Sequence, residues 1–146
     1  MATVNEDGSP HNSPLVFLYD KNLEYCFWGS HPNSQHSQNI VRTGQAFITV
    51  FDSIEGSVGT YIKAVDAKMV EGDELIEAVE IHNYFRAKAN KHPLDISYYQ
   101  GTSPQRMWRA KTAKVWINAY ERDENGRLLS DYKIEIIPKS LHELWL

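Results

Sequence analysis

The chain is organised around FWGSHPNSQHSQNI, residues 27–40. The aromatic residues at its start suit a pleated, half-buried strand, which Pro32 ends. A helix is predicted from Ser34 to Thr43, with Asn33 or Ser34 as its N-cap, because a short polar side chain there accepts a hydrogen bond from a first-turn N–H. Gly44 follows as the expected left-handed C-cap. The stretch therefore predicts a strand, a tight polar turn and a helix.

The start of this predicted helix is a candidate anion site. First-turn N–H groups and the positive end of the helix dipole favour phosphate. Ser34, Gln35, His36 and Ser37 could add hydroxyl, amide and imidazole contacts, since Ser34 and Ser37 share one helix face. The alternative is an ordinary capped surface helix, because capping residues are common at every helix start.

Length and composition indicate one domain covering residues 1–146. Hydrophobic residues make up 42% and charged residues 23%, ordinary values for a folded protein. A formal net charge of -4 and the lack of a basic block argue against nucleic acid as a partner. No apolar run is long enough for a membrane span, and no signal peptide is recognisable, so we expect a cytoplasmic protein without membrane contact.

Alternation and turn signals predict a mainly β chain. Strands are expected at residues 2–5, 10–19, 23–30, 46–51, 60–70, 111–121 and 132–137. Asp7-Gly8 marks a hairpin turn, and Pro14 indicates an edge position or a bulge in the second strand. Amphipathic spacing predicts a long helix over residues 73–90, and residues 105–108 are expected to form one more helical turn.

Conventional catalytic signatures are absent from the sequence. The six histidines form neither an HExxH pattern nor an i,i+4 pair on a helix, so no metal site is predicted. No GxSxG, Walker or GxGxxG pattern occurs. Cys26, the only cysteine, lies in an apolar strand and is expected to be a buried thiol rather than a nucleophile.

Several short motifs occur in a defined order. Residues 2–14 read ATV-x-x-DG-x-P-x-x-SP, the Ser34 helix start follows the aromatic strand, and residues 47–52 form an apolar run. In this order the sequence resembles the pyridoxamine 5'-phosphate oxidase-like family of FMN-binding split barrels, over residues 2–70 and more weakly over 113–120 and 132–135. The resemblance implies a six-stranded antiparallel split barrel with Greek-key topology. It also implies a homodimer with one FMN in each of two clefts at the interface.

The resemblance further implies which residues meet the cofactor. Ser34, Gln35, His36 and Ser37 would hold the FMN phosphate. The remaining positions would surround the flavin: Leu15 and Val16 through backbone groups at its edge, Trp28 and Gly29 beside the ribityl chain or ring, Thr49 and Val50 beneath it, and Trp116 or Trp108 from the partner chain.

Two adjacent positions depart from the family pattern. Gln35-His36 replaces the Arg-Lys pair that the family commonly has there, so a titratable imidazole stands in place of fixed positive charge. We therefore expect FMN affinity to rise as the pH falls through the pKa of His36.

The resemblance predicts a flavin-dependent oxidoreductase acting on an unidentified small organic molecule, with the electron chemistry supplied by the flavin. His11 and Tyr61 flank the predicted cleft and are candidate acid–base groups, although each is more often structural. The alternatives on the same barrel are a non-catalytic carrier of flavin or haem, a protein that uses F420 in place of FMN, and a dimeric scaffold with an empty cleft.

Overall fold

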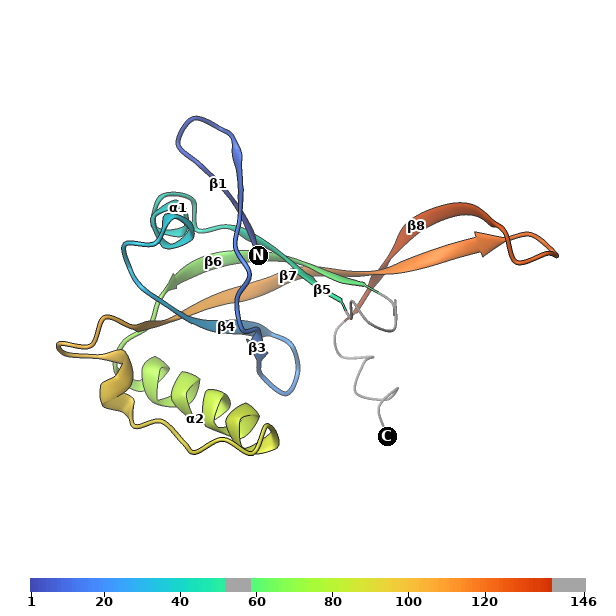
Figure 1. The fold of residues 1–146 in the computed structure, drawn as a ribbon. Helices are drawn as coiled ribbons and strands as arrows, with labels where there is room; N and C mark the ends of the chain where they lie inside the picture. Colours follow the sequence, from blue (N-terminus) through green and yellow to red (C-terminus); the bar gives the residue numbers. More distant parts are fainter. Residues whose placement is uncertain (52–58, 138–146) are drawn as a thin grey trace.

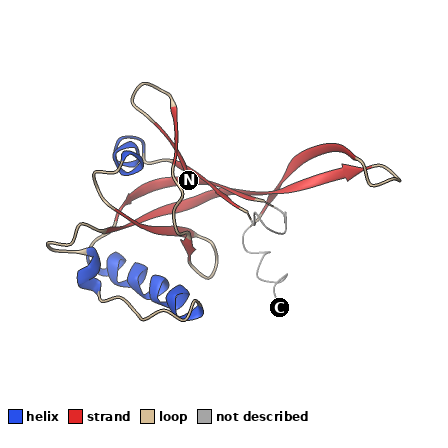
Figure 2. Ribbon diagram, in the orientation of Figure 1, coloured by secondary structure: helices blue, strands red, loops and turns tan. Residues whose placement is uncertain are grey.

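A computed structural model of the chain describes residues 1–51 and 59–137. Its centre is an antiparallel sheet of eight strands in the order β2-β1-β5-β6-β7-β4-β3, and β8 pairs with β7 beyond the part that pairs with β4. Helices α1 and α2 lie on opposite sides of this sheet (Figure 1). Among the described residues the sheet does not close into a full barrel. Strands dominate over helices, as Figure 2 shows, so the predicted mainly β class is confirmed.

The elements have the following bounds: β1 Ala2–Val4, β2 Pro10–Asn12, β3 Leu18–Tyr19, β4 Tyr25–Ser30, α1 Gln35–Thr43, β5 Ala46–Val50, β6 Thr60–Met69, α2 Gly72–Lys88, a 3-10 turn at Ile96–Tyr99, β7 Arg106–Arg122 and β8 Leu128–Ile136.

Two predicted elements differ from the structure. The expected strand over residues 10–19 is divided into β2 and β3, since Pro14 has no N–H for a ladder and residues 13–17 belong to no strand. The helical turn expected at residues 105–108 is wrong, because β7 begins at Arg106 and pairs with β4. Strand pairing overrides the local preference there. The eight strands, in place of the six implied by the resemblance, include the short β2 and β3.

The sheet curls at β6 and β7. The pairing of these strands shifts register between Lys63 and Ala64 and again between Val65 and Lys68. Asp66, inside the second shift, has a left-handed backbone with φ 50°. Such bulges bend a strand and increase its twist. Because of this curl, β4 and β5 face each other although β6 and β7 separate them in the sheet.

The curl encloses the larger of two hydrophobic clusters. It contains Trp28 of β4, Ile48 of β5, Ile62 of β6 and Val115 of β7, together with Ile40 of α1. The other face of the sheet packs on α2. Alternation along β4 assigns Trp28 to the first cluster and its neighbour Phe27 to the second. Cys26 is fully buried in the first cluster, and burial raises the pKa of its thiol to about 11, which fits the predicted inert thiol.

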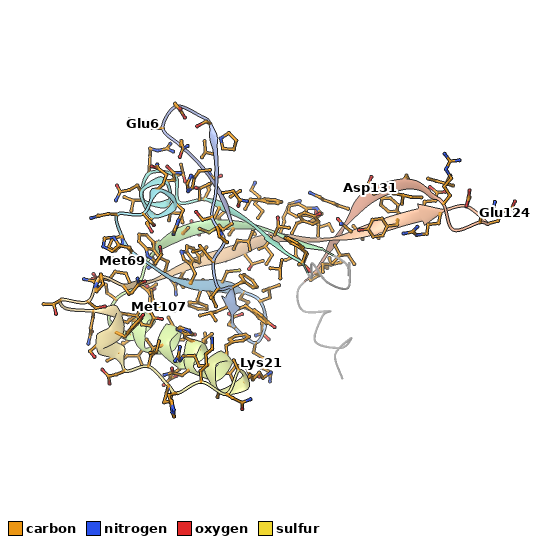
Figure 3. The ribbon with its side chains drawn as sticks, in the orientation of Figure 1. Glu6, Lys21, Met69, Met107, Glu124 and Asp131 are labelled. Carbon is orange, nitrogen blue, oxygen red and sulfur yellow. The ribbon has the colours of Figure 1, made fainter. Side chains whose placement is uncertain are left out.

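A two-stranded arm, residues 119–132, projects from the body of the sheet. Beyond Asn118, β7 pairs only with β8 among the described residues. Figure 3 shows Glu124 and Asp131 along this arm, far from the labelled side chains of the body. A two-stranded ribbon without further cover is marginally stable in water, so the arm is a candidate contact surface.

We expect Ile62→Ala to lower the free energy of unfolding by about 2–5 kcal/mol, because it opens a cavity where the side chain is 1% exposed. Ile76→Ala, on α2 with its side chain 49% exposed, serves as the matched control and should change stability by less than about 1 kcal/mol. Urea unfolding measures both. Equal losses in the two variants would contradict the core assignment.

Candidate functional site

Helix α1 begins and ends as its sequence predicts. Ser34 is the N-cap residue, with φ -67° and ψ 151°, and Gly44 is left-handed with φ 63°. The N–H of Gly44 donates to the carbonyl of Ile40 at 2.8 Å. The Ser34 side chain, however, makes no hydrogen bond to the helix backbone. Its hydroxyl lies in a side-chain cluster beneath the helix start.

This cluster, which we call the His36 cluster, consists of Ser13, Ser30, Ser34, His36 and Ser37. The imidazole Nδ1 of His36 lies 3.1 Å from the Ser13 hydroxyl. Its Nε2 lies 2.7 Å from the Ser30 hydroxyl and 3.1 Å from that of Ser34. The Ser34 hydroxyl in turn donates to the Ser37 hydroxyl at 2.9 Å. The cluster ties α1 to β4 and to the segment that follows β2.

Of the four residues predicted to hold phosphate, two have buried side chains and two are accessible at the helix start. His36 and Ser37 are buried and their side chains bond inward. Gln35 is exposed and donates to the Asn39 side chain at 3.1 Å, and Ser34 is half-buried. A phosphate at this helix start would meet backbone N–H groups and the side chains of Ser34 and Gln35, with the imidazole behind them.

The imidazole of His36 is a weak base in this environment. Burial lowers its pKa below the ordinary histidine value, and the positive charges of His11 and of the N-terminal amine lower it further. His11 connects to the same cluster, with its Nε2 3.1 Å from the Ser13 hydroxyl. The structure therefore places an uncharged imidazole behind the helix start at neutral pH.

A cleft of about 440 Å³ adjoins the His36 cluster. We call it the small cleft. It brings together four residues that the sequence assigned to the flavin, namely Leu15, Val16, Trp28 and Thr49. Ser13 belongs both to its wall and to the His36 cluster, so the small cleft and the start of α1 are neighbours. The walls are mainly apolar and include Phe17 and Ile48.

Trp28 is unusual among the wall residues. Its side chain is 2% exposed, and its indole N–H has no hydrogen-bond partner. No other buried side-chain nitrogen or oxygen in the described part of the chain lacks one. Buried donors without partners are rare in folded proteins, so this N–H is a candidate donor to a ligand.

Four other sequence-assigned residues lie outside the small cleft. Gly29 faces the opposite side of β4, where a Cβ would lie 3.2 Å from the Tyr99 ring. Val50 lines a second, larger cleft. Trp116 stacks on Phe47 with ring centroids 6.2 Å apart. Trp108 is buried in the core of its own chain, so it is not available to a partner chain.

The second cleft, here the large cleft, was not predicted from the sequence. It has a volume of about 1030 Å³ and lies between α2 and the turn that follows β3. Phe17, Tyr19 and Phe85 form an aromatic series along it, with centroid distances of 5.5 and 5.0 Å. Phe17 also lines the small cleft, so the two clefts share one wall. Only the aromatic positions in the α2 pattern hinted at this surface.

The two candidate acid–base residues line neither cleft. His11 belongs to the edge of the His36 cluster, and Tyr61 lies beneath the ammonium group of Lys133, 3.9 Å from its ring centroid. Within residues 1–51 and 59–137, no three His, Cys, Asp or Glu side chains form a group that could hold a metal ion. None of the helices in that part of the chain is long and apolar enough to cross a membrane.

The architecture is that of the split-barrel proteins, as expected from the sequence resemblance. Its structural neighbours include a pyridoxamine 5'-phosphate oxidase-related, FMN binding protein from Nostoc punctiforme, with 15% identity and a TM-score of 0.55. That alignment covers 91% of this chain and 84% of the neighbour. No family model and no curated protein sequence matches the chain.

Two further structural neighbours are named for other ligands, haem and F420. A heme binding protein from Mycobacterium smegmatis aligns with a TM-score of 0.63 and 19% identity over 96% of this chain. This chain spans about half of that protein, 53% of its length. An F420 reductase aligns with a TM-score of 0.54 and 13% identity, over 78% of this chain and 84% of the reductase. These likenesses establish the fold.

The lowered pKa of His36 predicts a pH-dependent stability. Because the folded pKa lies below the unfolded value, the unfolded chain binds more protons between the two, and stability falls as the pH drops through that window. We expect the melting temperature to fall between about pH 7.5 and 5.5, and to fall less in His36→Asn. The exposed His31→Asn variant should keep the wild-type slope. A slope in His36→Asn equal to that of the wild type would contradict the assignment.

Proposed function

We propose that the protein binds FMN, with the flavin ring in the small cleft and the phosphate at the start of α1. The observation that carries this proposal is the adjacency of these two features through Ser13, which belongs to both. Leu15, Val16, Trp28 and Thr49 supply a mainly apolar lining, as planar cofactors require. The FMN binding protein among the structural neighbours supports the same choice of ligand.

The residues present fit the cofactor at both ends. The unpartnered N–H of Trp28 offers one donor to a ring that carries several acceptors. At the other end, the backbone N–H groups of the helix N-terminus would bind the phosphate without a fixed cation. Bound phosphate would draw a proton to His36, so affinity would increase at lower pH. We therefore still expect FMN binding to depend on pH. Because burial lowers the pKa of His36, the pH midpoint of this dependence should be lower than for an exposed histidine.

The proposed activity is that of an oxidoreductase acting on a small organic molecule. Bound FMN would supply the electron chemistry, while the chain binds and orients both partners of the reaction. The large cleft is the proposed substrate site, since it shares the Phe17 wall with the small cleft. Its aromatic lining favours a flat, mainly apolar substrate.

A carrier role is the second candidate. Haem iron is held by His, Cys, Met or Tyr side chains, and Tyr19 and Tyr84 line the large cleft. The heme binding protein among the structural neighbours favours this alternative. F420 in place of FMN is the third candidate, supported by the F420 reductase.

We also propose a homodimer in which a second copy covers the arm. One face of β7 and β8 carries the pairs Val115–Ile136, Ile117–Ile134 and Ala119–Tyr132. This face is buried at Val115 in the body, but Tyr132 in the arm is 52% exposed. Its apolar side chains continue the core face outward without cover from the described residues. An interface there would bury apolar area that a lone chain leaves in water.

Flavin titration tests the proposed ligand. We expect the fluorescence of FMN to be quenched on binding. FMN should bind at least about tenfold more tightly than riboflavin, because riboflavin lacks the phosphate. Lowering the pH from about 8 to 5.5 should strengthen FMN binding and leave riboflavin binding unchanged.

Bleaching of the bound flavin by NAD(P)H favours the oxidoreductase, whereas a Soret band with hemin and no flavin binding favours the haem carrier. Equal affinities for FMN and riboflavin would contradict the phosphate site.

Two tyrosines on opposite faces of the arm test the dimer. Tyr132→Glu introduces charge on the apolar face and should weaken dimerisation at least about tenfold in sedimentation experiments. Tyr120→Glu, on the other face and 44% exposed, is the matched control and should leave the dimer intact. A monomeric wild-type protein, or equal effects of the two variants, would rule out this interface.

A further inference from the structure

We infer that Trp28 is a ligand-contacting residue whose indole N–H donates a hydrogen bond to an in-plane acceptor of the ring bound in the small cleft. The inference rests on the proposed function for the identity of that ring. It adds a specific donor and a requirement on the ligand, which must carry a carbonyl oxygen or an unprotonated ring nitrogen at its edge.

Strands β4 and β7 carry a pair of opposed tryptophans. Trp28 and Trp108 lie directly opposite each other across the two strands and belong to the same hydrophobic cluster. Both side chains are almost fully buried, at 2% and 1% exposure. The N–H of Trp108 donates to the carbonyl of Ser30 at 3.3 Å, whereas that of Trp28 has no partner. The two residues therefore differ chiefly in whether the indole N–H is hydrogen-bonded.

An unpaired buried donor is destabilising, so a phenylalanine would serve the core better if packing were the only requirement. Trp28 is also the member of the pair that lines the small cleft. The unpaired donor thus belongs to a residue that a ligand in the small cleft would contact. Binding residues commonly sacrifice stability in this way.

One wall of the small cleft can move without breaking the sheet. Pro14, Leu15, Val16 and Phe17 line the small cleft and lie between β2 and β3, outside any strand. Their displacement would cost no ladder hydrogen bonds. A ring entering beneath this segment would contact Trp28, whose indole N–H is buried in the absence of a ligand.

The lining restricts the class of ligand. Leu15, Phe17 and Ile48 provide apolar contact, and one donor in such a setting fixes orientation more than it adds affinity. A planar heteroaromatic ring with an acceptor at its edge meets both requirements. An aromatic hydrocarbon of the same shape would leave the Trp28 N–H unpaired and should bind less well.

The matched variants Trp28→Phe and Trp108→Phe test the inference. Both lose the same side-chain volume, but only Trp108→Phe loses a hydrogen bond of the free protein. We expect Trp108→Phe to have the lower melting temperature without ligand, and Trp28→Phe to bind both FMN and riboflavin about tenfold more weakly. Trp108→Phe should keep both affinities within about twofold. Equal weakening for riboflavin and FMN assigns the lost contact to the ring rather than the phosphate.

Nitrogen-15 NMR of the tryptophan indole groups gives a second readout that is independent of activity. The Trp28 indole signal, identified by its loss in Trp28→Phe, should move downfield when riboflavin is added to the full chain. Flavin binding with an unmoved signal, or undiminished affinity in Trp28→Phe, would overturn the inference and leave the proposed function standing. Absence of flavin binding in the wild-type protein would overturn both.

Discussion

The curl of the sheet at β6 and β7 is the constraint on which the candidate site depends. Two register shifts, with Asp66 in a left-handed conformation between them, bend the central strands. The bend brings β4 and β5 face to face, so Trp28 and Thr49 line one small cleft although they come from strands that do not pair. A flat sheet with the same sequence would keep two whole strands, β6 and β7, between these residues and leave no cleft between them.

The phosphate site that we propose at the start of α1 would work without a fixed cation. His36 hydrogen-bonds with three serine hydroxyls and turns away from solvent, which lowers its pKa. Its direct structural role is to tie the segment after β2 to α1. In the proposed site, attraction for an anion would come mainly from the helix backbone. A bound anion would also favour the protonated form of the His36 imidazole. This arrangement favours moderate, pH-dependent binding over the permanent affinity of an Arg-Lys pair.

The sequence predicted correctly those elements whose structure depends on neighbouring residues in the chain. The Asp7-Gly8 turn, the α1 helix and its Gly44 cap follow from turn and capping chemistry. The strand at Arg106 was missed because long-range pairing with β4 determines it. The inward turn of His36 and the large cleft beside α2 also depend on contacts between distant segments, which residue spacing does not encode. Motif order predicted the split-barrel fold because it reflects the whole arrangement.

We expect the small cleft, which lies between the segment after β2 and strand β5, to bind a planar ligand. The most direct test is a crystal structure of the protein grown with FMN. We expect ring density between Leu15 and Thr49, with phosphate density at the backbone of Ser34 and Gln35. Density for the ring in the large cleft against α2, with the start of α1 free of phosphate, would contradict it.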